Sequence, residues 1–115
     1  MRRLSVLVVL SLTIACNKEV TEPPPPETAT VTATANLQYL PPSVPIRTGG
    51  TVTWEFLSVA HTVIFDTKDG APDNIQDPVS NTTEQRTFGT AGTYRYTCSV
   101  QGHGAMIGFI NVVTP

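Results

Sequence analysis

After residue 16 the chain holds two histidines, one cysteine and one methionine, and all four have side chains that bind metals. They are His61, Cys98, His103 and Met106, and the last three fall within nine residues. Thiolate and thioether are soft donors that hold Cu(I), whereas imidazole suits Cu(II), so this mixture tolerates both oxidation states. Two imidazoles and a thiolate in a trigonal arrangement, with a weak axial thioether, make a blue copper site.

Each residue alone has a simpler structural interpretation. A single histidine on an apolar strand face is more often a hydrogen-bonded core residue than a ligand, and a single cysteine or methionine usually fills core space. The joint spacing favours a metal, because an unpaired thiol in an exported domain is open to oxidation unless it is bound. Zinc is the weaker alternative, since it has little use for a thioether and ranks below copper in intrinsic affinity. A Cys–His nucleophile pair would need the cysteine at a helix start or beside an oriented base, and no such helix is visible.

Apolar residues that alternate with a period of two predict the strands that must position these ligands. Val44 and Ile46 flank Pro45, whose missing amide donor suits an edge strand. No window of eleven residues shows helical spacing, so about seven short strands separated by turns predict a two-sheet sandwich. The alternating sets are Thr28–Ala35, Thr51–Phe56, then His61, Val63 and Phe65, then Tyr94, Tyr96 and Cys98, and last Met106, Gly108, Ile110 and Val112.

The stretch from Asp66 to Glu84 lacks clear periodicity and is predicted to be a surface excursion with room for a helical turn. It carries four aspartates, which either form an acidic patch for a cationic partner or simply keep the loop solvated. Solvation is the more economical interpretation. These aspartates are Asp66, Asp69, Asp73 and Asp77.

Residues 1–16 have the composition of a secretory signal peptide: two arginines, an apolar stretch from Leu4 to Ala15, and then a cysteine. The apolar stretch is too short to span a bilayer comfortably. The ending Thr13–Ile14–Ala15–Cys16 resembles a bacterial lipobox, and this resemblance implies that Cys16 is lipidated and becomes the first residue of the mature chain. An ordinary signal peptide or an uncleaved anchor is the alternative. We therefore expect an extracytoplasmic protein, in the periplasm or on the cell surface, that is anchored to the membrane by lipid.

Residues 17–29 are predicted to be a linker, because they contain four consecutive prolines among charged residues and almost no apolar side chains. Extended at about 3.1 Å per residue, the linker could hold the following domain roughly 40 Å from the anchor. The rest, residues 28–115, is long enough for one domain only. No basic cluster follows Arg3, which argues against nucleic-acid binding.

Four short segments of residues 28–115 match a known pattern: Gly49–Trp54, Ala60–Val63, Tyr94-x-Tyr96-x-Cys98, and His103-x-x-Met106-x-Gly108-x-Ile110-x-Val112. With them the domain resembles a cupredoxin of the plastocyanin and azurin type over nearly its whole length. The resemblance implies an all-β fold, namely a cupredoxin-like two-sheet Greek-key β-sandwich.

The same resemblance assigns roles to individual residues. It implies one copper ion, with His61, Cys98 and His103 as equatorial ligands and Met106 as the axial one. It also implies that Thr62 and Ser99, each next to a ligand, tie the two ligand segments together by hydrogen bonds. The second histidine would sit at the apolar end of the barrel, where electrons enter and leave.

The ligand loop combines two spacings. Four residues separate Cys98 from His103, as in azurins, whereas two separate His103 from Met106, as in amicyanin. This combination leaves the axial distance, and with it the reduction potential, open.

For function, the resemblance implies a mononuclear type 1 copper protein that carries single electrons between extracytoplasmic redox partners, such as cytochromes or a terminal oxidase or reductase. We expect a monomer without catalytic residues. The alternative is a copper chaperone or storage protein on the same fold. An enzyme is disfavoured because multicopper oxidases need His-x-His pairs and the binuclear copper centre of oxidases needs a second cysteine, and the mature domain has neither.

Overall fold

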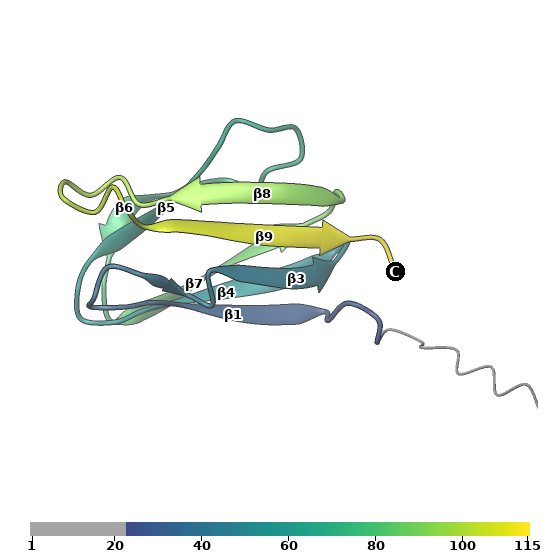
Figure 1. The fold of residues 1–115 in the computed structure, drawn as a ribbon, viewed down its shortest axis with the longest axis horizontal. Helices are drawn as coiled ribbons and strands as arrows, with labels where there is room; N and C mark the ends of the chain where they lie inside the picture. Colours follow the sequence, from purple (N-terminus) through teal and green to yellow (C-terminus); the bar gives the residue numbers. More distant parts are fainter. Residues whose placement is uncertain (1–22) are drawn as a thin grey trace, which may run out of the picture.

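A computed structural model describes residues 23–115 of the chain. These residues form nine strands and no helix, and the strands build two sheets that pack face to face (Figure 1). The predicted all-β two-sheet sandwich is thus confirmed, with two strands more than the seven expected. The strands are β1 (Thr28–Ala33), β2 (Tyr39–Leu40), β3 (Ser43–Arg47), β4 (Gly50–Phe56), β5 (His61–Phe65), β6 (Ile75–Val79), β7 (Thr82–Phe88), β8 (Gly92–Thr97) and β9 (Ile107–Val113).

Both sheets are mixed. The first has the strand order β2-β1-β4-β7, with β1 parallel to β4, and the second has the order β3-β9-β8-β5-β6, with β3 parallel to β9. Pro45 lies in β3, at the edge of the second sheet, as its missing amide donor predicts. In the second sheet β5 and β8 are antiparallel neighbours, with Ile64 opposite Thr97. The start of β5 and the end of β8 therefore meet at the same end of the sandwich.

The prediction of a surface excursion over residues 66–84 is wrong in part. The stretch holds β6 and the beginning of β7, and no helical turn. Each of these two strands buries a single residue fully, Ile75 in β6 and Phe88 in β7, while their other side chains are exposed or half-buried. A period-two alternation of apolar and polar residues appears only when a strand buries several positions on one face. β6 and β7 are mostly exposed to solvent, so they leave no such pattern in the sequence. The excursion begins at Asp66, whose carboxylate pairs with Arg95 at 3.1 Å.

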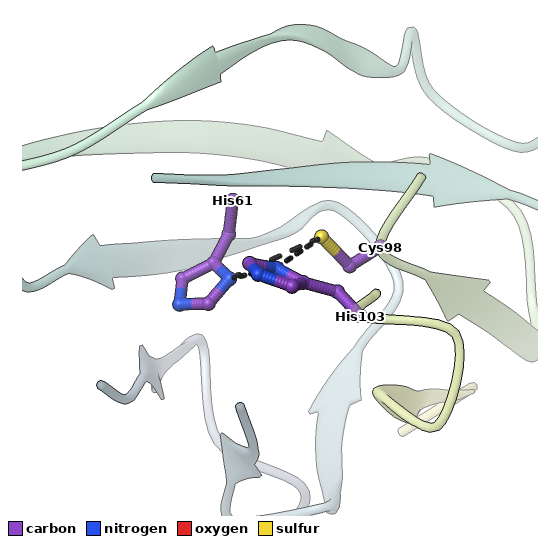
Figure 2. A group of neighbouring side chains, drawn as sticks. All are labelled: His61, Cys98 and His103. Atoms are coloured by element: carbon purple, nitrogen blue, oxygen red, sulfur yellow. Dashed lines mark hydrogen bonds between the residues drawn. The ribbon is translucent and has the colours of Figure 1, made fainter. Parts of the chain in front are cut away.

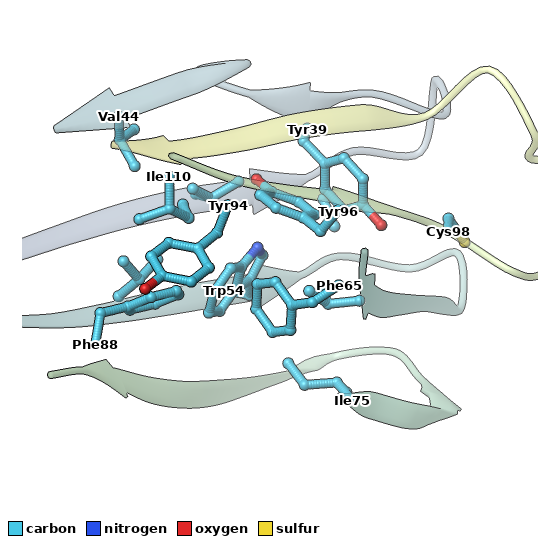
Figure 3. Packing of buried hydrophobic residues seen from close by; sticks show 14 of the residues in the cluster. Tyr39, Val44, Trp54, Phe65, Ile75, Phe88, Tyr94, Tyr96, Cys98 and Ile110 are labelled. Atoms are coloured by element: carbon cyan, nitrogen blue, oxygen red, sulfur yellow. The ribbon is translucent and has the colours of Figure 1, made fainter. Parts of the chain in front are cut away.

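Aromatic rings fill the space between the sheets (Figure 3). Trp54 of β4 is fully buried and meets Phe65 and Tyr96 edge-to-face, with ring centroids 6.0 and 5.5 Å apart. Tyr39 meets Tyr96 in the same way at 4.7 Å. Such pairs contribute about 0.5–1.5 kcal/mol each beyond the area they bury. Rings from both sheets therefore interlock and hold the two sheets in a fixed relation.

The two ends of the sandwich differ. The loop from β8 to β9 lies at one end, whereas the start of β1 and the C terminus lie at the other (Figure 1). At that second end the Arg47 amide donates to the Pro26 carbonyl and the Thr51 amide to the Glu27 carbonyl, each at 2.9 Å. Among the described residues, backbone hydrogen bonds to the domain thus reach back to Pro26, within the predicted linker of residues 17–29.

The predicted signal peptide, Cys16 and the first part of the linker lie outside the described residues. Within residues 23–115 no helix has the length and apolar character needed to cross a membrane.

Gly108 offers a test of this interior. The Tyr96 ring lies so close to Gly108 that an added Cβ would overlap its phenol atoms. We expect Gly108→Ala to push Tyr96 out of its packing with Trp54 and to lower the free energy of unfolding by about 1–3 kcal/mol, measured by denaturant titration of the metal-free protein. Gly89→Ala is the control, since its added Cβ would meet no atom within 4 Å and should change stability by at most about 0.5 kcal/mol. Equal stability of the two variants would contradict this packing.

Candidate metal centre

His61, the first residue of β5, is fully buried. Its Nε2–H donates to the carbonyl oxygen of Thr34 at 2.8 Å, which leaves Nδ1 as the nitrogen with a free lone pair. Burial lowers the pKa of His61 below its usual value because desolvation disfavours the imidazolium. The bond to Thr34 acts against this shift, and the nearby His103 adds to it. The bond to Thr34 therefore fixes the ring with Nδ1 aimed at the other candidate ligands.

Cys98 directly follows β8, and His103 lies in the loop that leads to β9. The Cys98 amide donates to the Met106 carbonyl at 3.4 Å, and the Met106 amide donates to the His103 carbonyl at 3.0 Å. The His103 amide in turn donates to the Val100 carbonyl at 3.0 Å. This bond spans a turn in which Gly102 has a φ of 84°. Glycine adopts this left-handed conformation without strain. The loop is therefore closed by its own backbone, so that His103 turns back toward Cys98.

Three donor atoms meet at this end of the sandwich (Figure 2). The Nδ1 atoms of His61 and His103 are 3.2 Å apart, and the Cys98 Sγ lies 3.9 and 3.6 Å from them. A point equidistant from the corners of this triangle lies about 2.1 Å from each atom, close to the 2.0–2.3 Å of metal–nitrogen and metal–sulfur bonds in zinc proteins. The three residues thus fit one metal ion as they stand.

Thr62 and Ser99 join the two ligand segments. The Ser99 amide donates to the Thr62 Oγ1 at 2.8 Å, and the two hydroxyl oxygens are 2.9 Å apart. The Thr62 amide donates to the Cys98 Sγ at 3.5 Å. A hydrogen bond to the sulfur fixes its position and withdraws charge from the thiolate. The segments around His61 and Cys98 are therefore coupled independently of any metal.

Met106 is buried, at the end of the ligand loop just before β9. Its backbone is bonded to both Cys98 and His103, which brings the residue to the same end of the sandwich. It also lines an open groove of about 250 Å³ between the ligand loop and the β1–β2 hairpin, together with Leu37 and Tyr39. Its role as the axial ligand remains a prediction.

Two residues of the β1–β2 hairpin support the site and were missed by the sequence analysis. Thr34 supplies the carbonyl that holds His61, and Tyr39 donates its hydroxyl to the Thr62 carbonyl at 2.5 Å. Burial raises the pKa of Tyr39 above its usual value, and the neighbouring Cys98 raises it further, so the phenol stays protonated as a donor. No local pattern marks either residue, because their partners are backbone groups far away in the sequence.

Comparison with known proteins agrees with this geometry. Residues 26–113 match the family model described as copper binding proteins of the plastocyanin/azurin family. The chain belongs to this family. The predicted resemblance to a cupredoxin is thereby confirmed, and the donor set of His61, Cys98 and His103, with Met106 beside it, suits the one copper ion that the family binds.

Solved structures with the same fold include a plastocyanin, an amicyanin and a nitrite reductase. A mutant fern plastocyanin, described in oxidized and reduced form, is 22% identical with a TM-score of 0.65 and covers 74% of this chain and 100% of its own. A reduced amicyanin mutant is 28% identical, with a TM-score of 0.62, 75% of this chain covered and 82% of its own. A copper-containing nitrite reductase from Thermus scotoductus SA-01 is 24% identical with a TM-score of 0.62, and covers 82% of this chain but only 23% of its own. No curated protein matches the chain.

Met106→Leu tests the axial assignment. Leucine nearly conserves the buried volume, so the protein should fold and keep copper on its three other ligands. Loss of the thioether weakens support for Cu(II), so the reduction potential of the copper-loaded protein should rise. Voltammetry measures this, and each rise of about 59 mV corresponds to a tenfold change in the ratio of Cu(I) to Cu(II) affinity. Ile107→Leu, at the neighbouring half-exposed residue, is the control. An unchanged potential in Met106→Leu would show that Met106 is not axial.

Proposed function

We propose that this blue copper protein carries single electrons between redox partners outside the cytoplasm. The observation that carries the proposal is the triangle of donor atoms from His61, Cys98 and His103, which has the dimensions of a metal site before any metal is considered. Bound copper would supply a one-electron couple between Cu(II) and Cu(I) at this site.

The hydrogen bonds around the ligands favour electron transfer. His61 is fixed through Nε2, the Cys98 sulfur accepts the Thr62 amide, and the backbone of the ligand loop closes on itself. Ligands held in this way move little when the charge of the metal changes. A small rearrangement lowers the barrier to gaining and losing an electron, which is what a carrier requires.

The position of His103 favours this residue as the point where electrons enter and leave. It is half-buried, whereas His61 and Cys98 are buried. Of these three ligands His103 alone reaches the surface, at the end of the sandwich formed by the β8–β9 loop (Figure 1). We propose that a redox partner, such as a cytochrome or a terminal oxidase or reductase, docks over this residue.

A copper chaperone or storage protein is the second candidate. A chaperone must release its metal to another protein, and burial of two of the three donors works against such an exchange. An enzyme has less support, because the plastocyanin and amicyanin structures resemble this chain over 100% and 82% of their own length, whereas the nitrite reductase does so over 23% of its own. We therefore propose that the protein is not an enzyme.

The absorption spectrum of the copper-loaded protein tests the proposal. We expect an intense visible band from thiolate-to-Cu(II) charge transfer, reversible one-electron voltammetry, and no loss of copper to a competing metal-free copper protein. Cys98→Ser should abolish the band and weaken copper retention, whereas Thr93→Ser, an exposed change in the preceding strand, should alter neither. A band that survives Cys98→Ser would refute the ligand assignment, and ready copper transfer would favour the chaperone.

We also propose that lipid on Cys16 attaches the protein to a membrane. The start of β1 lies at the end of the sandwich opposite to the ligand loop (Figure 1). A tether that joins the domain there leaves His103 free to meet a partner. One acyl chain holds a protein only marginally, whereas the several chains of a bacterial lipoprotein anchor it stably.

Fractionation of a bacterial host that expresses the full chain tests the anchor. Wild-type protein should incorporate labelled palmitate and sediment with membranes, whereas Cys16→Ala should lose the label. Cys98→Ser provides the control for a general effect of removing a cysteine, and it should keep the label. A labelled Cys16→Ala protein would exclude this attachment site.

A further inference from the structure

Tyr39, the first residue of β2, connects the first sheet to the metal centre in the second. Its side chain is 2% exposed, and its hydroxyl donates to the Thr62 carbonyl. We propose that Tyr39 is a positioning residue that holds Thr62 against the Cys98 sulfur and thereby raises the reduction potential of the bound copper. This inference rests on the copper site of the proposed function.

Thr62 is the link between Tyr39 and the sulfur. The Thr62 amide and hydroxyl lie 3.5 and 3.8 Å from the Cys98 Sγ, and both are placed to donate to it. Hydrogen bonds donated to a metal-bound thiolate draw charge from the sulfur, which weakens its support for Cu(II) more than for Cu(I). A residue that fixes Thr62 therefore raises the potential without touching the metal.

The hydroxyl of Tyr39 can act as a fixed point because the core holds its ring. The ring packs edge-to-face on Tyr96, with an interplanar angle of 67°, and Tyr96 packs in turn on Trp54 and against Gly108. Figure 3 shows Tyr39 and Tyr96 side by side, with Cys98 beyond them. The bond to Thr62 thus transmits the rigidity of the interior to the site.

The β1–β2 hairpin holds His61 and the residue that follows it by two hydrogen bonds. Thr34, at one end of the hairpin turn, accepts the His61 Nε2–H, while Tyr39, at the other, holds the next residue in β5. The turn is closed by the Thr34 amide, which donates to the Gln38 carbonyl at 2.8 Å, and by the Gln38 amide, which donates to the Thr34 Oγ1 at 3.2 Å. Residues 61 and 62 therefore cannot shift relative to each other without opening the hairpin.

Tyr39→Phe removes the hydroxyl and keeps the ring. In the copper-loaded protein we expect a lower reduction potential, a charge-transfer band at longer wavelength, and a severalfold fall in the ratio of Cu(I) to Cu(II) affinity. Tyr94→Phe is the matched control, because its hydroxyl also donates to a backbone carbonyl, that of Thr90 at 2.7 Å, but near the start of β8 and away from the metal. The control should lose stability without a change in potential or band.

The outcomes separate a positioning role from a purely structural one. If Tyr39→Phe unfolds more easily but keeps the wild-type potential and band, the proposal is wrong. The band and potential of the wild type test the proposed function, whereas the difference between wild type and Tyr39→Phe tests this inference, so the two failures are distinguishable.

Discussion

Pairing of β5 with β8 is the constraint on which the metal centre depends. These strands are antiparallel neighbours, with Phe65 opposite Tyr96, so the residue that starts one strand comes to the level where the other ends. His61 and Cys98 therefore meet although they are far apart in the sequence. The hydrogen bonds between Thr62 and Ser99 join β5 to the segment after β8, beyond the last paired residues of the two strands. Only the third ligand needs a loop, and that loop starts and ends on adjacent strands, β8 and β9.

Much of this arrangement could be predicted from the sequence, because apolar and polar residues alternate along a strand that buries one face. β4, β5 and β8 bury one face almost completely, and their residues alternate clearly enough to place His61 and Cys98 on inward faces. β6 and β7 were not predicted, because each strand buries only one residue fully and its other residues are exposed or half-buried. The ligand types could be predicted for a different reason. After residue 16 the chain has one cysteine, two histidines and one methionine, so few that their spacing carries information.

The supporting shell of the site could not be predicted in the same way. The Thr34 carbonyl and the Tyr39 hydroxyl contact residues of another sheet, and a backbone acceptor has no identity in the sequence. Thr62 and Ser99 were found only because they adjoin ligands. Hydrogen bonds between distant elements depend on how the sheets pack, and packing is set by the whole set of interlocked rings around Trp54. Ligands can thus be predicted from residue type, whereas the groups that tune them require the fold.

The division between the two ends of the sandwich unites the site with the proposed function. One end carries the ligand loop and His103, and the other carries the start of β1, where Arg47 bonds to Pro26 and pairs with Glu27. Attachment through the N-terminal segment consequently places no load on the metal ligands. The rigid core between the ends keeps the ligand geometry independent of how the N-terminal segment is held. In the proposed anchored carrier, the metal centre would therefore keep its geometry while the domain meets its proposed redox partners.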